Sequence, residues 1–334
     1  MQTRRDILAG LAATTLAPGL APGFAAAQGA YPNQPIRIIV GYAAGGGVDI
    51  VARLLQEPLK SALGGGQPVL VENRTGAAAM LASNAVAKAA PDGHTLLAAA
   101  SGEVAINQHL YGAKMTYDPA KELVPVALVG IVPCVIVVAT TTPVNNPKEL
   151  IAYARANPRK LSFSSSGVGN PQHLAGELMN SMAGTNVLPV PYRGSAPAVT
   201  DVATGAVTMS FSSLAAALPL IDSGKIRAVA VTSLDKMPQL PNVEPLQNGD
   251  PKLKGYELLN WFGIFGTAGT PPDIVEKLNG IINGALNDKA NAEKLIPQGI
   301  VPRAMKVAEF KKFVADETAK FGKVMQTANI KLEN

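Results

Sequence analysis

Strand-like and helix-like segments alternate along this chain from Tyr31 onward, and this alternation limits the possible folds more than any other feature. The apolar run IRIIVG (36–41) precedes a helical pattern at 48–63, in which Pro58 predicts a kink. PVLVEN (68–73) precedes an Ala-rich helical pattern at 79–89, and the alternation continues to residue 326. Strands that alternate with helices favour parallel sheets with helices on both faces, so we expect an α/β fold.

One stretch needs a separate decision, because LVPVALVGIVPCVIVVA (123–139) carries no charge over almost the length of a membrane span. Pro125 and Pro133 interrupt it and Val dominates it, which favours two buried strands joined at a proline. Cys134, the only cysteine, lies within it and has no partner for an internal disulfide. Its apolar neighbours predict an inert buried thiol and not a catalytic one.

The first 27 residues have the pattern of a signal peptide. Arg4 and Arg5 precede a short apolar stretch, and Ala25 to Ala27 supply the small residues that a signal peptidase requires. The arginine pair fits twin-arginine export and also occurs in Sec signals. We therefore expect cleavage after Ala27 and a mature protein in the periplasm.

Charge and motifs exclude several classes of function. The net charge of +5 comes from 29 basic and 24 acidic residues spread along 334 positions, whereas a nucleic-acid-binding protein concentrates basic residues in a patch. His94, His109 and His173 are far apart in the sequence, and no G-x-S-x-G elbow occurs. His94 lies in a turn and is expected to be a surface or edge residue. We predict neither an enzyme nor a cofactor or metal site, and an exported hydrolase remains the catalytic alternative.

Two glycine-rich loops carry the main functional signal. AAGGGVD (43–49) and SSSGVGN (164–170) each follow a strand and precede a helix, and neither matches a phosphate-loop or dinucleotide pattern. Free N–H groups and the dipole of a helix N-terminus attract anions, and glycines permit close approach. We predict that the loops lie on different lobes, with their helix starts facing across a cleft that holds a small carboxylate. Asp49 also fits the role of a helix cap.

Several motifs in this order resemble one known family. They are YPNQPIRIIVGYAAGGGVDIVARLL, VENRTGAAA, PDGHTLL, YDPAKELVPV, SSGVGNPQHLAGELM, VPYRG, AVTS and GTAGTPPDIVEKLN. Together they resemble the Bug/TctC family, the periplasmic solute-binding proteins of tripartite tricarboxylate transporters. The resemblance extends from Tyr31 to the C-terminal helices.

The resemblance implies a two-lobed, type II-like periplasmic binding protein fold. Each lobe would be a sheet flanked by helices, with the ligand cleft between the lobes closing like a flytrap. Residues 31–130 with 257–334 would form lobe 1, and residues 131–256 lobe 2. The implied partners are a small organic acid and the large and small membrane subunits of a transporter, with a membrane sensor as the alternative. A monomer without nucleic-acid partners is expected.

The family's ligand contacts come from backbone and hydroxyl groups of both lobes. Carried over to this chain, they imply a site formed by the two loops, position 101 and the segment 190–201. The implied ligand-binding residues are Tyr42, Ala43, Ala44, Gly45, Gly46, Gly47, Asp49, Ser101, Ser165, Ser166, Gly167, Gly169, Asn170, His173, Tyr192, Gly194, Ala196 and Asp201.

The chain departs from the family pattern near this site. Thr75 and the stretch 78–82 stand where the family has proline and glycines, so side chains there are expected to hinder close approach of the ligand. Tyr42 stands where Phe is common, and its hydroxyl is a candidate for recognising a polar group. Tyr42, Phe163 and Trp261 are candidates for an apolar wall. Citrate-like, dicarboxylic and aromatic acids all remain open.

Overall fold

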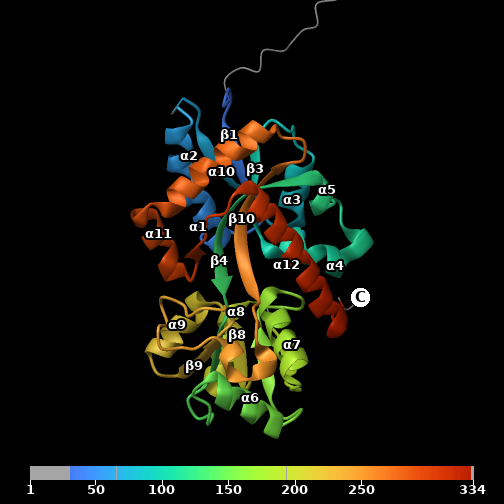
Figure 1. The fold of residues 1–334 in the computed structure, drawn as a ribbon, viewed down its shortest axis with the longest axis vertical. Coiled ribbons are helices and arrows are strands. Elements are labelled where there is room, and N and C mark those ends of the chain that lie inside the picture. Colours follow the sequence, from blue (N-terminus) through green and yellow to red (C-terminus); the bar gives the residue numbers. More distant parts are fainter. Residues whose placement is uncertain (1–30, 65, 193, 332–334) are drawn as a thin grey trace, which may run out of the picture.

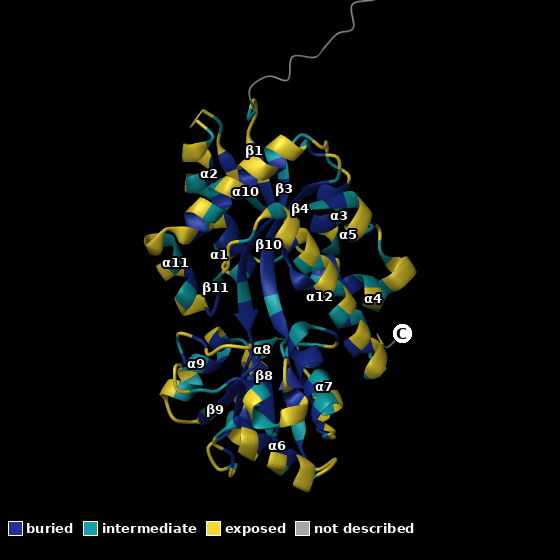
Figure 2. Cartoon of the chain, in the orientation of Figure 1, coloured by how far each residue is buried: buried dark blue, intermediate teal, exposed yellow. Residues whose placement is uncertain are grey.

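The computed structural model describes residues 31–64, 66–192 and 194–331, which form two sheets arranged along the long axis of the molecule (Figure 1). The predicted signal peptide (1–27) lies outside the described residues. In Figure 2 the strands of both sheets are largely buried, while the flanking helices carry the exposed residues. The two-lobed α/β prediction is confirmed, and the exact division into lobes stays a prediction.

The first sheet has six strands in the order β11-β4-β10-β3-β1-β2. β1 pairs in parallel with β2 and β3, whereas β10 is antiparallel to β3 and β4, and β11 is antiparallel to β4. The strands are β1 (Ile36–Val40), β2 (Val69–Asn73), β3 (Thr95–Ala100), β4 (Leu123–Pro133), β10 (Leu259–Thr267) and β11 (Val301–Pro302).

The second sheet has five strands in the order β7-β6-β8-β5-β9. They are β5 (Val135–Ala139), β6 (Ser162–Ser165), β7 (Leu188–Pro191), β8 (Met209–Ser212) and β9 (Ile226–Val231). β6 is parallel to β7 and β8, and β5 is antiparallel to β8 and β9. Both sheets are therefore mixed: the expected parallel pairs are present beside antiparallel ones. β4 leaves the first sheet for β5 of the second sheet, and β10 later returns to the first sheet beside β4, so β4 and β10 run in opposite directions.

Helices cover both sheets, and α1 and α3 begin within one residue of the predicted starts at 48 and 79. They are α1 (Gly47–Leu54), α2 (Gln56–Ala62), α3 (Met80–Ala87), α4 (Asn107–Tyr111), α5 (Pro119–Glu122), α6 (Pro147–Ala156), α7 (Pro171–Ala183), α8 (Ser195–Thr204), α9 (Leu214–Asp222), α10 (Pro272–Asn287), α11 (Lys289–Leu295) and α12 (Val307–Thr327). The helix expected at 48–63 is divided at Leu55, before Pro58, because Pro58 has no N–H to bond the Leu54 carbonyl.

The charge-free stretch at 123–139 carries the chain from one sheet to the other. β4 ends at Pro133 and β5 begins at Val135, which confirms two strands joined at a proline. Thr232 joins the crossing segments: its Oγ1 accepts from the Cys134 N–H at 2.8 Å, and its N–H donates to the Cys134 carbonyl at 3.0 Å. Among the described helices, none combines the length and apolar character of a membrane span.

The hydrophobic core is continuous across this junction. One cluster of buried side chains includes Leu128 and Trp261 from the first sheet together with Phe163 and Leu174 from the second sheet and α7. The C-terminal helix α12 contributes Phe310 and Phe321 to the same cluster and packs against both β4 and α7. The core therefore places the two sheets at a defined separation on either side of the crossing strands.

Candidate ligand site between the two sheets

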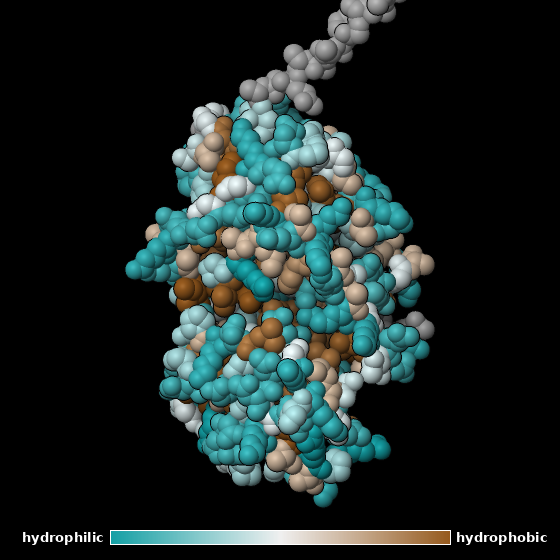
Figure 3. All heavy atoms as spheres, in the orientation of Figure 1, coloured by the Kyte–Doolittle hydropathy of each residue, from teal (hydrophilic) through white to brown (hydrophobic). Residues whose placement is uncertain are grey.

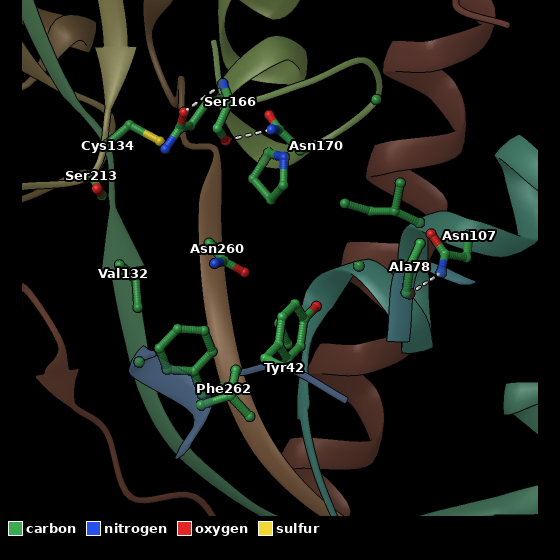
Figure 4. A pocket seen from close by; sticks show the side chains of 18 of the residues that line it. Tyr42, Ala78, Asn107, Val132, Cys134, Ser166, Asn170, Ser213, Asn260 and Phe262 are labelled. Atoms are coloured by element: carbon green, nitrogen blue, oxygen red, sulfur yellow. Dashed lines mark hydrogen bonds between the residues drawn. The ribbon is translucent and has the colours of Figure 1, made fainter. Parts of the chain in front are cut away.

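A cavity of about 420 Å³ lies between the two sheets beside the crossing strands (Figure 4). Apolar surface is visible at the waist of the molecule in Figure 3. The cavity is lined by Tyr42, Gly46, Gly47, Val48, Ala78, Ala100, Gly102, Ile106, Asn107, Leu110, Tyr111, Val132, Pro133, Cys134, Ser166, Val168, Gly169, Asn170, Pro171, Gln172, Ser213, Asn260 and Phe262. Residues from both predicted loops are among them, so both helix starts meet at one cavity.

The first loop brings the start of α1 to the cavity. Gly46 is the N-cap of α1, and no side chain bonds the first N–H groups of this helix. Gly47 has no room for a side chain, because a Cβ atom there would lie 2.8 Å from Cε2 of Phe262. The close approach of Phe262 thus requires glycine and leaves the backbone of the helix start open to a ligand.

Asp49 holds this loop in place and does not line the cavity. Its buried carboxylate accepts hydrogen bonds from the Gly45 N–H (2.9 Å), Arg53 Nε (2.9 Å) and Asn73 Nδ2 (2.8 Å). Burial raises the pKa of Asp49, but the bonds from Arg53, Gly45 and Asn73 outweigh it and lower the pKa to about 2. Asp49 is therefore ionised at neutral pH and ties the glycine loop to α1 and β2.

The second loop reaches the cavity with its own hydrogen bonds largely satisfied. The Asn170 side chain caps α7 by accepting from the His173 N–H at 3.0 Å, and its Nδ2 donates to Ser166 Oγ. The Gly169 N–H donates to Nδ1 of His173 at 3.0 Å, and burial lowers the pKa of His173. His173 thus supports the loop from beneath in its neutral form and does not line the cavity.

A third helix start, which the sequence analysis did not identify as part of the site, also borders the cavity. Ser213 is the N-cap of α9 and lines the cavity, and its side chain makes no capping hydrogen bond. The first N–H groups of α9 therefore have no side-chain partner from their own cap. The pair Ser212-Ser213 between a strand and a helix was an available signal, since it repeats the pattern of the second loop.

Tyr42 lines the cavity, but its hydroxyl already has an internal partner. Tyr42 Oη donates to Glu103 Oε2 at 2.7 Å, and Glu103 Oε1 accepts from the Ala100 N–H at 2.9 Å. Glu103 lies in a π-helical turn (Gly102–Ile106) and is fully buried. Burial raises the pKa of Glu103 to about 7. Any role of the Tyr42 hydroxyl in recognising a polar group of a ligand therefore also depends on Glu103.

Six of the implied ligand-binding residues line the cavity: Tyr42, Gly46, Gly47, Ser166, Gly169 and Asn170. Ser101 lies just behind it and bonds Asn260 Oδ1 at 2.9 Å, and Asn260 itself lines the cavity. Tyr192 does not line the cavity, and its hydroxyl donates to the Asp201 carboxylate in the same lobe. Those outside the lining are Ala43, Ala44, Gly45, Asp49, Ser101, Ser165, Gly167, His173, Tyr192, Gly194, Ala196 and Asp201.

The expected wall of Tyr42, Phe163 and Trp261 does not form. Phe163 is buried against Phe211, and Trp261 packs edge-on against Phe310. Phe262 lines the cavity in place of Trp261, because successive side chains of a strand point to opposite faces. Whether Trp261 or Phe262 lines the cavity depends on which face of β10 is turned toward it.

The stretch 78–82, where the sequence departs from the family pattern, reaches the site, because Ala78 lines the cavity. Ala77, Ala78 and Ala79 have φ values of 47°, 52° and 67°, in the left-handed region that favours glycine. Asn107 Nδ2 donates to the Ala78 carbonyl at 3.1 Å and helps to hold this turn.

Two further expectations concern single side chains. His94 is buried, 6% exposed, between the Tyr31 ring and Asp92, so the expectation of a surface residue was wrong. Cys134 is buried as predicted, and burial raises its pKa to about 12, which leaves it as a neutral thiol at the cavity wall.

None of the described residues that line the cavity carries a formal charge. The polar groups are amides, hydroxyls and the backbone N–H groups of helix starts. Within residues 31–64, 66–192 and 194–331 there is no cluster of His, Cys, Asp and Glu side chains suited to a metal ion. The arrangement can hold an anion through hydrogen bonds and helix dipoles, with apolar side chains around the rest of the molecule.

Comparison with known proteins finds relatives over most of the chain. Residues 51–330 match the model of the tripartite tricarboxylate transporter family receptor, TctC. A "UPF0065 protein in tcbD-tcbE intergenic region" of Pseudomonas sp. strain P51 is 39% identical, covering 89% of this chain and 86% of the relative. Protein BugT of Bordetella pertussis is 35% identical, covering 91% and 92%.

Two solved structures with the same fold were determined with an organic acid. A protein of R. palustris solved with adipate is 34% identical and superposes with a TM-score of 0.76, covering 90% of this chain and all of that one. MatC from Rhodopseudomonas palustris, with bound malate, is 29% identical with a TM-score of 0.70, covering 88% and 99%.

Proposed function

This chain belongs to the tripartite tricarboxylate transporter receptor family, and from that premise we propose that it captures a small organic carboxylate in the cavity between its two sheets. The observation that carries the proposal is the meeting of the α1 and α9 starts at a cavity whose described lining has no charged side chain. Helix N-termini bind carboxylates without a basic residue. The adipate and malate bound by two structural relatives favour a dicarboxylate.

The proposed mechanism is closure of the two lobes about the crossing strands at Cys134 and Thr232. A ligand that contacts both the first loop and the second loop binds more tightly to the closed state and shifts the population toward it. The receptor acts in the periplasm as a monomer without catalytic activity or cofactor. It delivers the acid to the large and small membrane subunits of a tripartite transporter.

A thermal-shift screen of the purified protein tests the proposal. The panel contains adipate, malate, citrate and benzoate, with adipamide as the uncharged match of adipate. A ligand at a hundred times its dissociation constant adds about 2.7 kcal/mol of stability, which a melting curve resolves readily. Stabilisation by acids and not by the amide supports the proposal, and equal stabilisation by adipamide contradicts carboxylate recognition.

A further inference from the structure

Glu103 is a buried acid placed directly behind the wall of the ligand cavity. Ala100 and Gly102, which precede it closely in the chain, line the cavity. Tyr42 also lines the cavity, and its hydroxyl donates to Glu103 Oε2 at 2.7 Å. The Glu103 side chain itself is fully buried. The Tyr42 side chain therefore contacts both this carboxyl and the cavity in which a ligand anion would lie.

No described cation compensates a charge on Glu103. Its carboxyl contacts are the Tyr42 hydroxyl and the Ala100 N–H, and the Tyr117 hydroxyl donates to the Glu103 backbone carbonyl. A buried carboxylate without a positive partner is costly, and the group takes up a proton instead. Burial accordingly raises the pKa of Glu103 to about 7.

The elements packed around the Gly102–Ile106 turn supply no counter-ion either. β3, α3 and the 77–79 turn have no titratable side chain. The charged groups of the other neighbouring elements either have partners elsewhere or are exposed to solvent. On α4, His109 contacts the Thr318 carbonyl, and the α5 residues Lys121 and Glu122 pair with Asp118 and Lys88. On α12, Lys312 pairs with Asp316 and Lys320 with Glu317, the Glu309 carboxylate accepts from the Lys306 N–H, and Lys311 and Lys323 are exposed.

We propose that Glu103 is a positioning residue that couples carboxylate capture to the uptake of one proton, acting through the Tyr42 hydroxyl. The inference rests on the proposed function. When Glu103 is ionised, the Tyr42 hydrogen is committed to Oε2 and the cavity faces only the lone pairs of the phenol oxygen. When Glu103 is protonated, its O–H donates to Tyr42 Oη, and the Tyr42 hydrogen is free to donate into the cavity.

The direction of the coupling follows from charge. A ligand carboxylate beside Tyr42 repels an ionised Glu103 and accepts a hydrogen bond from Tyr42 only in the protonated state. The ligand therefore raises the proton affinity of Glu103, and by linkage a proton on Glu103 raises the affinity for the ligand. Affinity is expected to fall by up to about tenfold per pH unit above the pKa of the free protein, the limit for one linked proton.

The test measures the affinity of the whole protein for adipate and malate by calorimetry between pH 5.5 and 8.5. Wild type is compared with Glu103→Gln, whose amide resembles the protonated acid and keeps a donor toward Tyr42 Oη. Glu317→Gln is the matched control, because Glu317 is another buried acid but lies on α12 outside the cavity lining. Buffers of different ionisation enthalpy report the number of protons taken up.

The inference predicts that wild type and Glu317→Gln bind more weakly as pH rises and take up close to one proton near pH 8. Glu103→Gln should bind with an affinity that does not change with pH. If the acids bind equally at all pH values, or if Glu103→Gln keeps the wild-type pH profile, the coupling is overturned and the receptor function stands. If neither acid binds any variant at any pH, the proposed function is overturned together with the coupling.

Discussion

Asp49 and Glu103 are two buried carboxyls beside the first loop, and their surroundings shift their pKa values in opposite directions. Asp49 accepts three hydrogen bonds, one of them from the Arg53 guanidinium, and its pKa falls to about 2. Glu103 has only neutral donors and its pKa rises to about 7. The charged Asp49 fixes the loop backbone, while the neutral form of Glu103 leaves the cavity wall without a negative charge.

Replacing Asp49 by Asn is expected to destabilise the protein at neutral pH. The pKa of Asp49 is lower in the folded state than its ordinary value of 3.8, so the stability that Asp49 contributes is present above pH 3.8 and is lost as the pH falls toward 2. We expect a deficit of about 1 kcal/mol for Asp49→Asn at pH 7, since the half-exposed Arg53 is screened by solvent. Urea denaturation at pH 7, 5 and 3 measures it.

The difference in the free energy of unfolding between wild type and Asp49→Asn should become smaller between pH 5 and pH 3. Asp273→Asn is the control, because Asp273 is also in the first turn of a helix but is exposed. A deficit of the same size at pH 7 and pH 3 would show that Asp49 acts through packing and not through its charge.

At the scale of single elements, the starts of α1 and α9 are the parts of the cavity best suited to an anion. Both have N-caps without side-chain capping bonds, whereas α7 is capped by Asn170. The two glycine loops are thus unequal in their chemistry. The first loop offers free backbone donors, and the second offers a shaped wall held by Gln172 and His173.

Gly46→Val tests the role of the first loop. The backbone of Gly46 (φ −77°, ψ 164°) accepts a β-branched residue, and the nearest atom to a Cβ there is the Ala43 carbonyl oxygen at 3.4 Å. The fold should persist while the side chain obstructs the α1 start. We expect adipate affinity to fall at least tenfold, about 1.4 kcal/mol, because the carboxylate loses hydrogen bonds on burial.

The matched control is Gly66→Val, at an exposed position where a Cβ meets no atom within 4 Å. Calorimetric titration of both variants with adipate at one pH measures their affinities. Unchanged affinity in Gly46→Val would remove the first loop from the binding site.

At the scale of the whole molecule, the two sheets approach each other through residues that are distant in sequence. Gly169 in the second loop faces Leu110 of α4, and a Cβ at Gly169 would lie 2.5 Å from a methyl carbon of Leu110. The crossing strands and the continuous core hold the sheets on one side of the cavity. On the opposite side of the cavity, the lobes approach each other at this close contact between Gly169 of the second loop and Leu110 of α4.

Gly169→Ala is therefore expected to hinder closure. The added methyl group meets Leu110 and keeps the lobes apart, so ligand should bind more weakly and cause a smaller decrease in the radius of gyration. X-ray scattering with and without adipate measures the decrease.

Gly205→Ala controls for backbone strain, because Gly205 has a similar φ (+81° against +71°) but a Cβ there meets no atom within 4 Å. Both variants should lose about 1–2 kcal/mol of stability from the left-handed conformation, and only Gly169→Ala should lose compaction. Equal compaction by ligand in the two variants would contradict a role of this contact in closure.

The sequence by itself determined the elements and the two loops. Hydrophobic period, prolines and glycines act between near neighbours in the chain, so β1 (Ile36–Val40), β2 (Val69–Asn73) and the β4–β5 junction lie where they were predicted. For the same reason the glycine loops were found: a strand followed by glycines and a helix start is a local pattern.

Only the tertiary structure decided strand direction and the composition of the cavity wall. Tyr42 meets Glu103 across 61 residues, and Ser101 meets Asn260 across 159 residues. Whether Trp261 or Phe262 faces the cavity depends on the register of β10 between β3 and β4. Contacts of this kind form when distant segments pack, and local propensity carries no information about which of two adjacent side chains will point inward.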